Sequence, residues 1–453
     1  MQIQKWNWHP TIGLLFIIIS SYLGFIPQQR DFLFIILPYL SICLLGMCAY
    51  WQSGQEEQIH FWIGVAIVAR VILVFALPNL SDDVYRFIWD GYLLNAGINP
   101  FEQLPSYYIE NQIQIPGIDK ALFEQLNSPE YFSIYPPVAQ FTFVFSTWLF
   151  PSSYYGATII MKLFLLAFEI GNILLILKLL RYFQFPAKNV LLYALHPLII
   201  IEIVGNLHFE GAMIFFLLFA FWFLVQQKWP WSAVFMSLSV ASKLLPLIFL
   251  PFLIRRLGWK KAMMYFSLLG ICLLFVFVPL LSSVFFNNFG ESLDLYFRRF
   301  EFNASIFYLA RWAGYQEVGY NLIKYIGPSL ALVTFLGIVL ATFLERSLSW
   351  RNFPLVGLFA ITIYTFNTPT VHPWYICLPI MWCIFTEYRY PLVWSVLIFF
   401  TYVNYSYPDY QENQWVIWIE YIGVWLMLLY DFRKVPDRRS STLPHCRPQG
   451  LET

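Results

Sequence analysis

Apolar segments separated by short polar breaks follow one another along nearly the whole chain. Roughly 12 to 14 of them approach the length of about 20 residues with which a helix crosses a bilayer. They lie near 11–27, 32–50, 60–78, 137–150, 155–180, 189–204, 211–226, 231–254, 261–286, 321–344, 353–367, 373–386, 391–405 and 414–430. The pattern predicts an all-α polytopic integral membrane protein, in which 137–150 and parts of 189–254 could be re-entrant instead of spanning.

Two polar intervals are too long to be simple turns between spans. The first runs from Asn79 to Ile134, and the second runs from Asn287 to about Gly319. Because no internal repeat or low-complexity tract divides the chain, we expect one transmembrane domain over residues 1–435, with loops at 79–134 and 287–319. Residues 436–453 are expected to form a short cytoplasmic tail.

Composition agrees with a membrane protein and narrows the range of partners. Hydrophobic residues make up 59% of the chain and charged residues only 12%, whereas soluble domains carry about 25% charged residues. The formal net charge is +1, and no basic stripe predicts binding of nucleic acid. The six cysteines form no CxxC pair, so neither a disulfide framework nor a zinc site is expected.

Lysine and arginine predict the orientation, because short cytoplasmic loops carry an excess of both. Basic clusters occur at Arg255-Arg256, Lys260-Lys261, Arg346 to Arg351, Arg389 and Arg433 to Arg439. With these clusters in the cytoplasm, both long loops and His372 fall on the extracytoplasmic side. Lys178, Arg181 and Lys188 conflict with a simple count of spans, and a re-entrant segment nearby would remove that conflict.

The first long loop opens with a predicted helix from Asp82 to Ala96. Ser81 is the expected N-cap, and Gly97 and Pro100 are expected to end the helix. Its apolar side predicts that it lies along the membrane surface. Asp82, Arg86 and Asp90 recur every fourth residue and therefore share one face.

Acids in a first helical turn are ordinary, since they favour the helix N-terminus, and Arg86 could simply form ion pairs with its neighbours. The position of these residues favours a functional reading. The acids follow a membrane-spanning segment directly, and an aromatic cluster from Tyr131 to Pro137 returns to the same membrane edge. A site for chemistry on a lipid-borne substrate is the prediction that accounts for both.

Several segments resemble one known superfamily. They are Ser81–Gly91, Gly97–Pro100 and Ile134–Gln140, with weaker likenesses at Gly205–Glu210, Ser242–Pro246 and His372–Tyr375. In these residues the chain resembles the GT-C superfamily of polytopic glycosyltransferases, most closely its bacterial mannosyltransferase-like branch. It departs from the pattern where Glu210 stands in place of a frequent aspartate and Phe209 in place of a frequent asparagine.

The resemblance implies a GT-C-type transmembrane helix bundle with interfacial helices in the first loop, in the cell inner (cytoplasmic) membrane, with its active site on the extracytoplasmic face. It implies a polyprenyl-phosphate hexose donor, mannose above other sugars, and a lipid-linked or glycan acceptor. The donor's lipid tail would then lie among the spans and the membrane lipids.

The chemistry of such a transfer fits the acids of the first loop. A phosphate leaving group is a weak base, so one carboxylate that takes the acceptor's proton is sufficient, and the sugar carbon inverts. Asp82 and Asp83 are the candidate bases. The resemblance favours Asp82, because the first acid of such pairs is the base in similar enzymes. No cofactor is required, and a divalent metal held by Asp82, Asp83 and His208 lacks a supporting ligand spacing.

Cations are expected near the developing phosphate charge. Lys243 is a candidate, because an ionisable side chain inside an apolar run is costly and usually functional, although it could instead snorkel to the cytoplasmic face. Arg298, Arg299 and Arg311 in and after the second loop are further candidates, and solvated surface charge is an equally good explanation for the first two. Glu169 and Lys162 are expected to form a buried ion pair that fixes helix packing.

Further substrate contacts are predicted around these groups. The candidates are Arg86, Trp89, Asp90, Asn99, Tyr135, His208, Glu210 and His372. For His372, beside Trp374 and Tyr375, an interfacial aromatic belt is the simpler explanation.

Two other classes compete with a transferase. A transporter or flippase of lipid-linked sugars would show matched breaks in two internal repeats, which the sequence lacks. A non-catalytic scaffold would give no reason for acids, arginines and aromatic residues gathered on one face.

Overall fold

The computed structural model of the protein describes residues 8–434. The α-helices are α1 (His9–Phe25), α2 (Phe32–Gln52), α3 (Glu56–Val74), α4 (Asp83–Asn95), α5 (Pro105–Glu110), α6 (Lys120–Glu124), α7 (Pro137–Leu149), α8 (Tyr154–Tyr182), α9 (Leu191–Ala194), α10 (Pro197–Ile199), α11 (Glu210–Val225), α12 (Trp229–Ser242), α13 (Leu250–Leu257), α14 (Trp259–Phe277), α15 (Phe285–Arg298), α16 (Ile306–Val318), α17 (Ile323–Leu344), α18 (Phe353–Asn367), α19 (Cys377–Cys383), α20 (Tyr390–Ile398) and α21 (Gln414–Lys434).

Shorter helical turns join these helices. They are the π-helix η2 (Ile200–Gly205) and the 3-10 turns η1 (Ala187–Val190), η3 (Leu245–Phe249), η4 (Val278–Leu280), η5 (Trp350–Asn352), η6 (Pro373–Ile376) and η7 (Phe399–Ser406). The one backbone pairing of β type within residues 8–434 is an isolated bridge between Phe302 and Thr370. The predicted tail, 436–453, lies outside the described residues.

The helices form a membrane-spanning bundle. Six of the described helices are each long and apolar enough to cross a membrane, namely α2, α3, α8, α14 with η4, α17 and α21. A further pair, Ala187–Ala194 and Pro197–Gly205, passes the same test together with a bend of 51°. The all-α polytopic prediction is confirmed. Fewer single helices span than the sequence has apolar runs, because several runs are short or broken in two.

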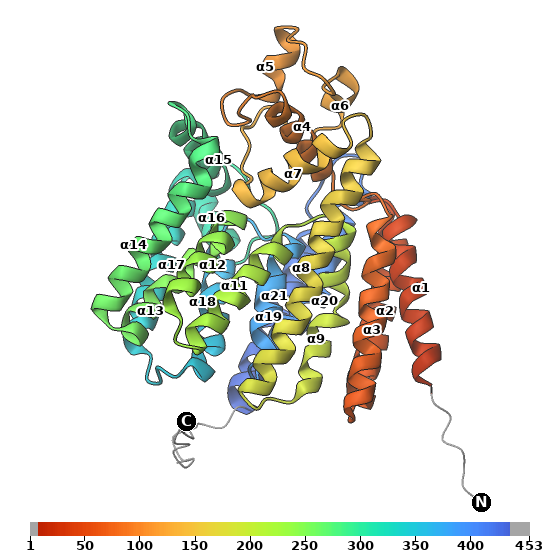
Figure 1. The fold of residues 1–453 in the computed structure, drawn as a ribbon, viewed down its shortest axis with the longest axis vertical. Helices are drawn as coiled ribbons and strands as arrows, with labels where there is room; N and C mark the ends of the chain where they lie inside the picture. Colours follow the sequence, from red (N-terminus) through yellow and green to blue (C-terminus); the bar gives the residue numbers. More distant parts are fainter. Residues whose placement is uncertain (1–7, 435–453) are drawn as a thin grey trace, which may run out of the picture.

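The run 137–150 is one of those that do not span. It forms α7, whose 13 residues cover only about 20 Å at 1.5 Å per residue. Figure 1 shows α7 beside α4, α5 and α6 in a layer of loops and short helices that covers one end of the bundle. We call this end the loop end. A Cβ at Gly91 of α4 would come within 2.7 Å of the Phe143 carbonyl oxygen of α7, so glycine permits the close contact of these two helices.

The opposite end of the bundle gathers the basic clusters, and we call it the basic end. Arg181 pairs with Glu56, Lys188 lies over the Tyr50 ring, and Arg351 lies over the Phe185 ring. Because α7 stays at the loop end, α8 begins there and its 29 residues reach the basic end (Figure 1). The conflict over Lys178, Arg181 and Lys188 is thereby removed, and these residues lie with the other basic clusters.

Buried charges fix the packing of the first half of the bundle, but with partners other than those expected. Glu169 of α8 pairs with Arg70 of α3 at 3.1 Å, and both side chains are fully buried. Lys162 donates instead to the carbonyl oxygens of Leu73, Ala76 and Gly205, at 3.1, 2.6 and 2.7 Å. The expected pair of Glu169 with Lys162 was wrong. Lys162 joins the end of α3 to the end of η2.

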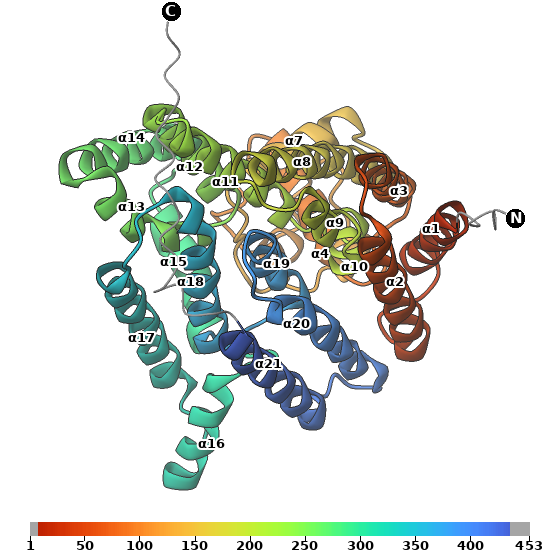
Figure 2. The same ribbon diagram turned by 90° about the horizontal axis from the view of Figure 1, so that it is seen from below.

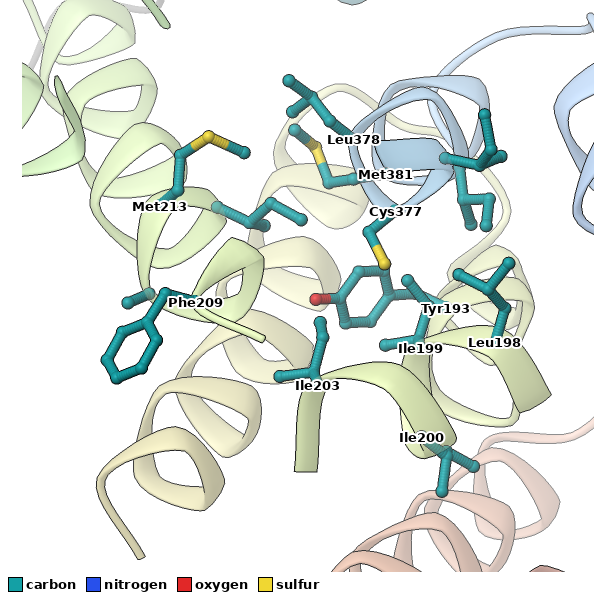
Figure 3. Close-up of a cluster of buried hydrophobic side chains, with 14 of the residues drawn as sticks. Tyr193, Leu198, Ile199, Ile200, Ile203, Phe209, Met213, Cys377, Leu378 and Met381 are labelled. Carbon is teal, nitrogen blue, oxygen red and sulfur yellow. The ribbon is translucent and has the colours of Figure 1, made fainter. Parts of the chain in front are cut away.

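An apolar core lies beneath the loop end and packs against η2 and α11. Figure 3 shows Ile199, Ile203, Met213, Cys377 and Met381 packed together from the segments α10, η2, α11 and α19. Seen from the basic end in Figure 2, α19 lies near the middle of the bundle, while α13, α14 and α17 lie toward one edge. The core therefore holds η2 and α11 in place beneath the loop end.

Candidate active site

The acids of the first loop lie at the start of α4. The predicted helix forms as Asp83–Asn95, but Asp82 and not Ser81 occupies the N-cap position, and its side chain makes no capping hydrogen bond. The helix is also enclosed by protein. Phe87, Ile88 and Trp89 are at most 1% exposed, because α7 packs on one side and the short helices of the loop end cover the other (Figure 1). Covered in this way, α4 is rigidly held.

Asp82 opens into a large cavity. Its side chain is accessible from that cavity, and the surrounding protein partly desolvates the carboxyl group. This desolvation, with a smaller effect from the charge of Asp83, raises the pKa of Asp82 above its ordinary value. Asp82 therefore has a higher proton affinity than a surface aspartate.

Asp83 is held from two sides. Asn127 Nδ2 donates to Asp83 Oδ1 at 2.8 Å, and His208 Nε2 lies 3.9 Å from Asp83 Oδ2. Asn127 belongs to the segment after α6, whereas His208 lies between η2 and α11. The carboxylate thus connects the covering loops with the bundle.

His208 is positioned by the π-helix before it. Its Nδ1 lies 3.0 Å from the Glu202 carbonyl oxygen and 3.2 Å from Glu202 Oε2. The preceding Leu207 has a φ of +68°, a left-handed conformation that costs a residue with a Cβ about 1–2 kcal/mol. Two hydrogen bonds hold this turn, one from Lys162 to the Gly205 carbonyl oxygen and one from Leu80 N to Asn206 Oδ1 at 3.3 Å.

Glu202 is completely buried in η2. It accepts hydrogen bonds from the Tyr402 hydroxyl at 2.9 Å and from Asn206 Nδ2 at 3.3 Å, in addition to facing His208. Sequence reasoning missed Glu202, Tyr402 and Asn127. Glu202 could have been found, because it is the lone acid in the apolar run 189–204, and an ionisable residue inside such a run is functional by default.

Lys243 lies at the break between α12 and η3 and lines the same cavity. α12 ends at Ser242, and the chain turns back through Pro246 into α13, which returns toward the basic end, where Arg256 pairs with Glu345. Lys243 pairs with the buried Glu210 of α11, and its Nζ lies 4.5 Å from the Tyr375 ring centroid. The run 231–254 is therefore not one straight span, and Lys243 does not reach the basic end.

Stacked rings form one wall of the cavity. Phe302, His372, Trp374 and His208 follow one another, with centroid separations of 4.5, 4.4 and 3.8 Å. The bridge of Phe302 to Thr370 fixes the start of this stack. The stack joins the second long loop and η6 to the η2–α11 turn, so His372 belongs to the cavity wall.

Two predicted residues of α4, Arg86 and Asp90, form a support behind the acids. Arg86 Nε donates to Asp90 Oδ1 at 2.9 Å, and Arg86 also binds the carbonyl oxygens of Ser128 and Tyr131. Asp90 accepts from Gln140 Nε2 at 2.8 Å and from the Ser133 hydroxyl. Arg86 borders the cavity, whereas Asp90 and Trp89 lie outside its lining. These contacts fasten the 128–140 segment over the site.

Four other predicted residues are not brought to the cavity. Asn99 Nδ2 donates to the Leu280 carbonyl at 2.7 Å and joins the first loop to the end of α14. Arg298 pairs with Asp294 at the exposed surface of α15, Arg299 is exposed, and Arg311 pairs with Glu301. None of the four lines the cavity. The two cations that do line it are Lys243 and Arg86.

The cavity has a volume of about 950 Å³ and two chemically different parts. One part holds Asp82, Asp83, Tyr135, His208, Glu210 and Lys243. The other runs between η3 with α13 and α17, and its lining is apolar apart from Thr334. We call it the apolar arm, formed by Leu244, Leu247, Ile248, Pro251, Ala331, Thr334, Phe335 and Ile338. Leu247 and Phe335 are 41% and 59% exposed, so the arm reaches the outer surface of the bundle. Within residues 8–434, no group of three His, Cys, Asp or Glu side chains could hold a metal ion.

A multi-pass helical protein with acids and a lysine at the end of an apolar groove has the features of a membrane enzyme acting on an amphipathic substrate. Comparison with known families identifies the class of enzyme. The family described as alpha-(1->6)-mannopyranosyltransferase, N-terminal domain, matches residues 20–258, just over half of the chain. The protein belongs to this family and is a glycosyltransferase. No curated protein matches the chain. The matched region contains Asp82, Asp83, Glu202, His208 and Lys243.

Proposed function

We propose that the protein transfers a hexose, most simply mannose, from a polyprenyl-phosphate donor to a hydroxyl of a lipid-linked or glycan acceptor, with inversion at the sugar carbon. The observation that carries the proposal is the cavity itself, which joins a pair of aspartates and a lysine to an apolar arm open at the bundle surface. A water-soluble nucleotide-sugar donor would have no use for such an arm.

Each part of the donor has a counterpart in the cavity. The polyprenyl chain lies in the apolar arm between α13 and α17, where it contacts side chains such as Leu247 and Phe335. The phosphate lies at the junction of the two parts, where Lys243 supplies a positive charge as charge builds up on the leaving group. The sugar then extends toward Asp82 and Asp83, under the loop end.

The transfer needs one base. As the acceptor oxygen forms its bond to the anomeric carbon, the bond from that carbon to the phosphate oxygen breaks, and its electron pair stays on the phosphate. The proton of the acceptor hydroxyl passes to the aspartate pair, and Asp82 is the direct base because it opens into the cavity and its pKa is raised toward the working pH. No metal or other cofactor takes part in this scheme.

The proposed location is the inner membrane, with the loop end outside. Short cytoplasmic loops are rich in lysine and arginine, and the clusters around Arg181, Arg256 and Arg389 share the basic end. The site would then act on substrates at the extracytoplasmic face.

The test is a transfer assay with the purified protein in lipid, using radiolabelled polyprenyl-phosphate mannose and a membrane-lipid extract. Asp82→Asn should lower turnover by about 100-fold or more, in the range for loss of a general base, and Asp83→Asn should lower it less. A chelator should leave the rate unchanged, and the product should have the anomeric configuration opposite to the donor's.

Asp119→Asn is the matched control. Asp119 caps α6 in the same loop by accepting from Leu122 N at 2.8 Å, it lies outside the cavity lining, and asparagine caps a helix equally well. Glucose and arabinose donors test the choice of sugar. Equal turnover by wild type and Asp82→Asn would refute the base, and no transfer from any donor, with movement of the donor between leaflets, would favour a transporter.

A further inference from the structure

The contacts of His208 determine which of its nitrogens carries the proton. Nδ1 faces two acceptors, the Glu202 carbonyl oxygen at 3.0 Å and Glu202 Oε2 at 3.2 Å. A ring nitrogen between two acceptors must carry its hydrogen, so the neutral ring has a lone pair on Nε2. Nε2 is buried, has no hydrogen-bond partner among the described residues, and lies 3.9 Å from Asp83 Oδ2.

The geometry points to His208 as the second proton acceptor of the site, with Glu202 as the residue that positions it; this inference rests on the proposed function. After transfer, the acceptor's proton resides on the aspartate pair. A small rotation of Asp83 brings its Oδ2 within hydrogen-bond distance of Nε2, and the proton passes to the ring. The pair is again ionised, and the buried carboxylate of Glu202 stabilises the imidazolium.

The surroundings favour this path over a purely structural role. His208 faces a carboxyl group from each of its two nitrogens, and its ring stacks on Trp374 at a centroid distance of 3.8 Å. Glu202 is itself held by Tyr402 and Asn206, so its carboxylate cannot turn away. A structural histidine would need one partner, whereas the unpaired Nε2 aimed at Asp83 leaves a lone pair with no structural use.

Other ionisable groups surround His208. They are Asp82 and Asp83 of the α4 turn, Glu210 with its partner Lys243, His372 across Trp374, and the Tyr402 and Tyr405 hydroxyls of η7. Glu210 and Lys243 neutralise each other. The carboxylate in direct contact with the ring is Glu202, so its removal should destabilise the protonated ring more than removal of any other group.

Glu202→Gln tests the inference, because it removes the charge and keeps the shape. Turnover should fall about 10- to 100-fold while the KM for the donor stays within twofold. Its loss removes the negative charge that stabilises the imidazolium once the proton has passed to the ring. Glu202→Asp should restore part of the turnover.

Tyr402→Phe is the matched control, since it removes a hydrogen bond from the other oxygen of Glu202 and keeps the charge. Because the charge remains, turnover should fall less than in Glu202→Gln. Unchanged turnover in Glu202→Gln would overturn the relay while the transferase stands, whereas a rise in donor KM alone would make Glu202 a purely structural residue.

A second measurement does not depend on turnover. In ¹⁵N-histidine spectra of the protein in nanodiscs, with His208→Asn used to assign the signal, His208 should be the Nδ1–H tautomer at neutral pH. An Nε2–H tautomer would overturn the relay even if no donor had been found. Absence of any transfer together with the Nδ1–H tautomer would refute the proposed function and, with it, the relay.

Discussion

Asp82 and Asp83 are neighbours in sequence but have different surroundings. Asp83 is fixed by Asn127 and faces His208, whereas Asp82 makes no capping hydrogen bond and opens into the cavity. In the proposed mechanism, this difference makes Asp82 the base and Asp83 the residue that supports it. The sequence predicted the pair but offered only a family likeness as a reason to prefer Asp82.

The pH dependence of transfer should report the raised pKa of Asp82. A base works when ionised, so the rate should fall as the pH drops through a value higher than that of an ordinary aspartate. Because the charge of Asp83 contributes to the shift, Asp83→Asn should lower the pKa of Asp82 and move the acid limb of kcat/KM to lower pH. An acid limb that moves to higher pH in Asp83→Asn would contradict the claim that the charge of Asp83 raises the pKa of Asp82.

Lys243 and Glu210 should be separable by a double variant. Lys243→Met removes the charge that is proposed to bind the phosphate, so turnover should fall. It also leaves Glu210 buried without its partner, so the free energy of unfolding should fall by about 1–3 kcal/mol. Adding Glu210→Gln should restore most of the melting temperature but not the turnover. Recovery of both would mean that the pair is only structural.

At the scale of elements, local signals predicted α4 well and its neighbours less well. Residues such as Gly97 act on the adjacent backbone, and the helix ends within one residue of the predicted end. The turn at Lys243 also carries a local signal, Pro246, but whether a broken helix continues or turns back depends on packing against α14 and α17. Periodicity does not encode that choice.

The apolar arm gives a prediction at the same scale. Ala331→Trp places a large ring in the apolar arm. The KM for a long-chain donor should therefore rise at least tenfold, while the KM for a short-chain analogue stays unchanged. Leu332→Trp is the control, because Leu332 is 58% exposed and is not part of the cavity lining. Equal effects of the two variants on both donors would remove the arm from the mechanism.

The whole molecule brings together groups that the sequence keeps far apart. Glu202, His208 and Asp83 meet because η2 and the α3–α4 connection are both tied to Lys162. Arg298 and Arg311 were further candidates for the phosphate in the sequence, yet each forms a local ion pair away from the cavity. The sequence therefore predicted the class of fold and eight of the residues that line the cavity, but not which cations reach the site, since that depends on the path of the second loop.

Orientation is a property of the whole molecule and can be tested directly. In a variant without native cysteines, Gln112→Cys at the loop end should react with an impermeant maleimide added to intact cells, and Lys228→Cys should react only after lysis. Both positions are exposed. The opposite pattern would place the basic end outside and the proposed site in the cytoplasm.

The turn at Lys243 has a consequence for how far a lipid must move. The 14 residues of α12 bring Lys243 about 21 Å from the start of that helix, well short of the roughly 30 Å of a hydrocarbon layer. If the donor is the proposed polyprenyl phosphate, a phosphate bound at this depth lets every isoprene unit stay among acyl chains. Lifting one five-carbon unit into water would cost about 4 kcal/mol, so under the proposed function a recessed lysine would let the donor diffuse in sideways without leaving its leaflet.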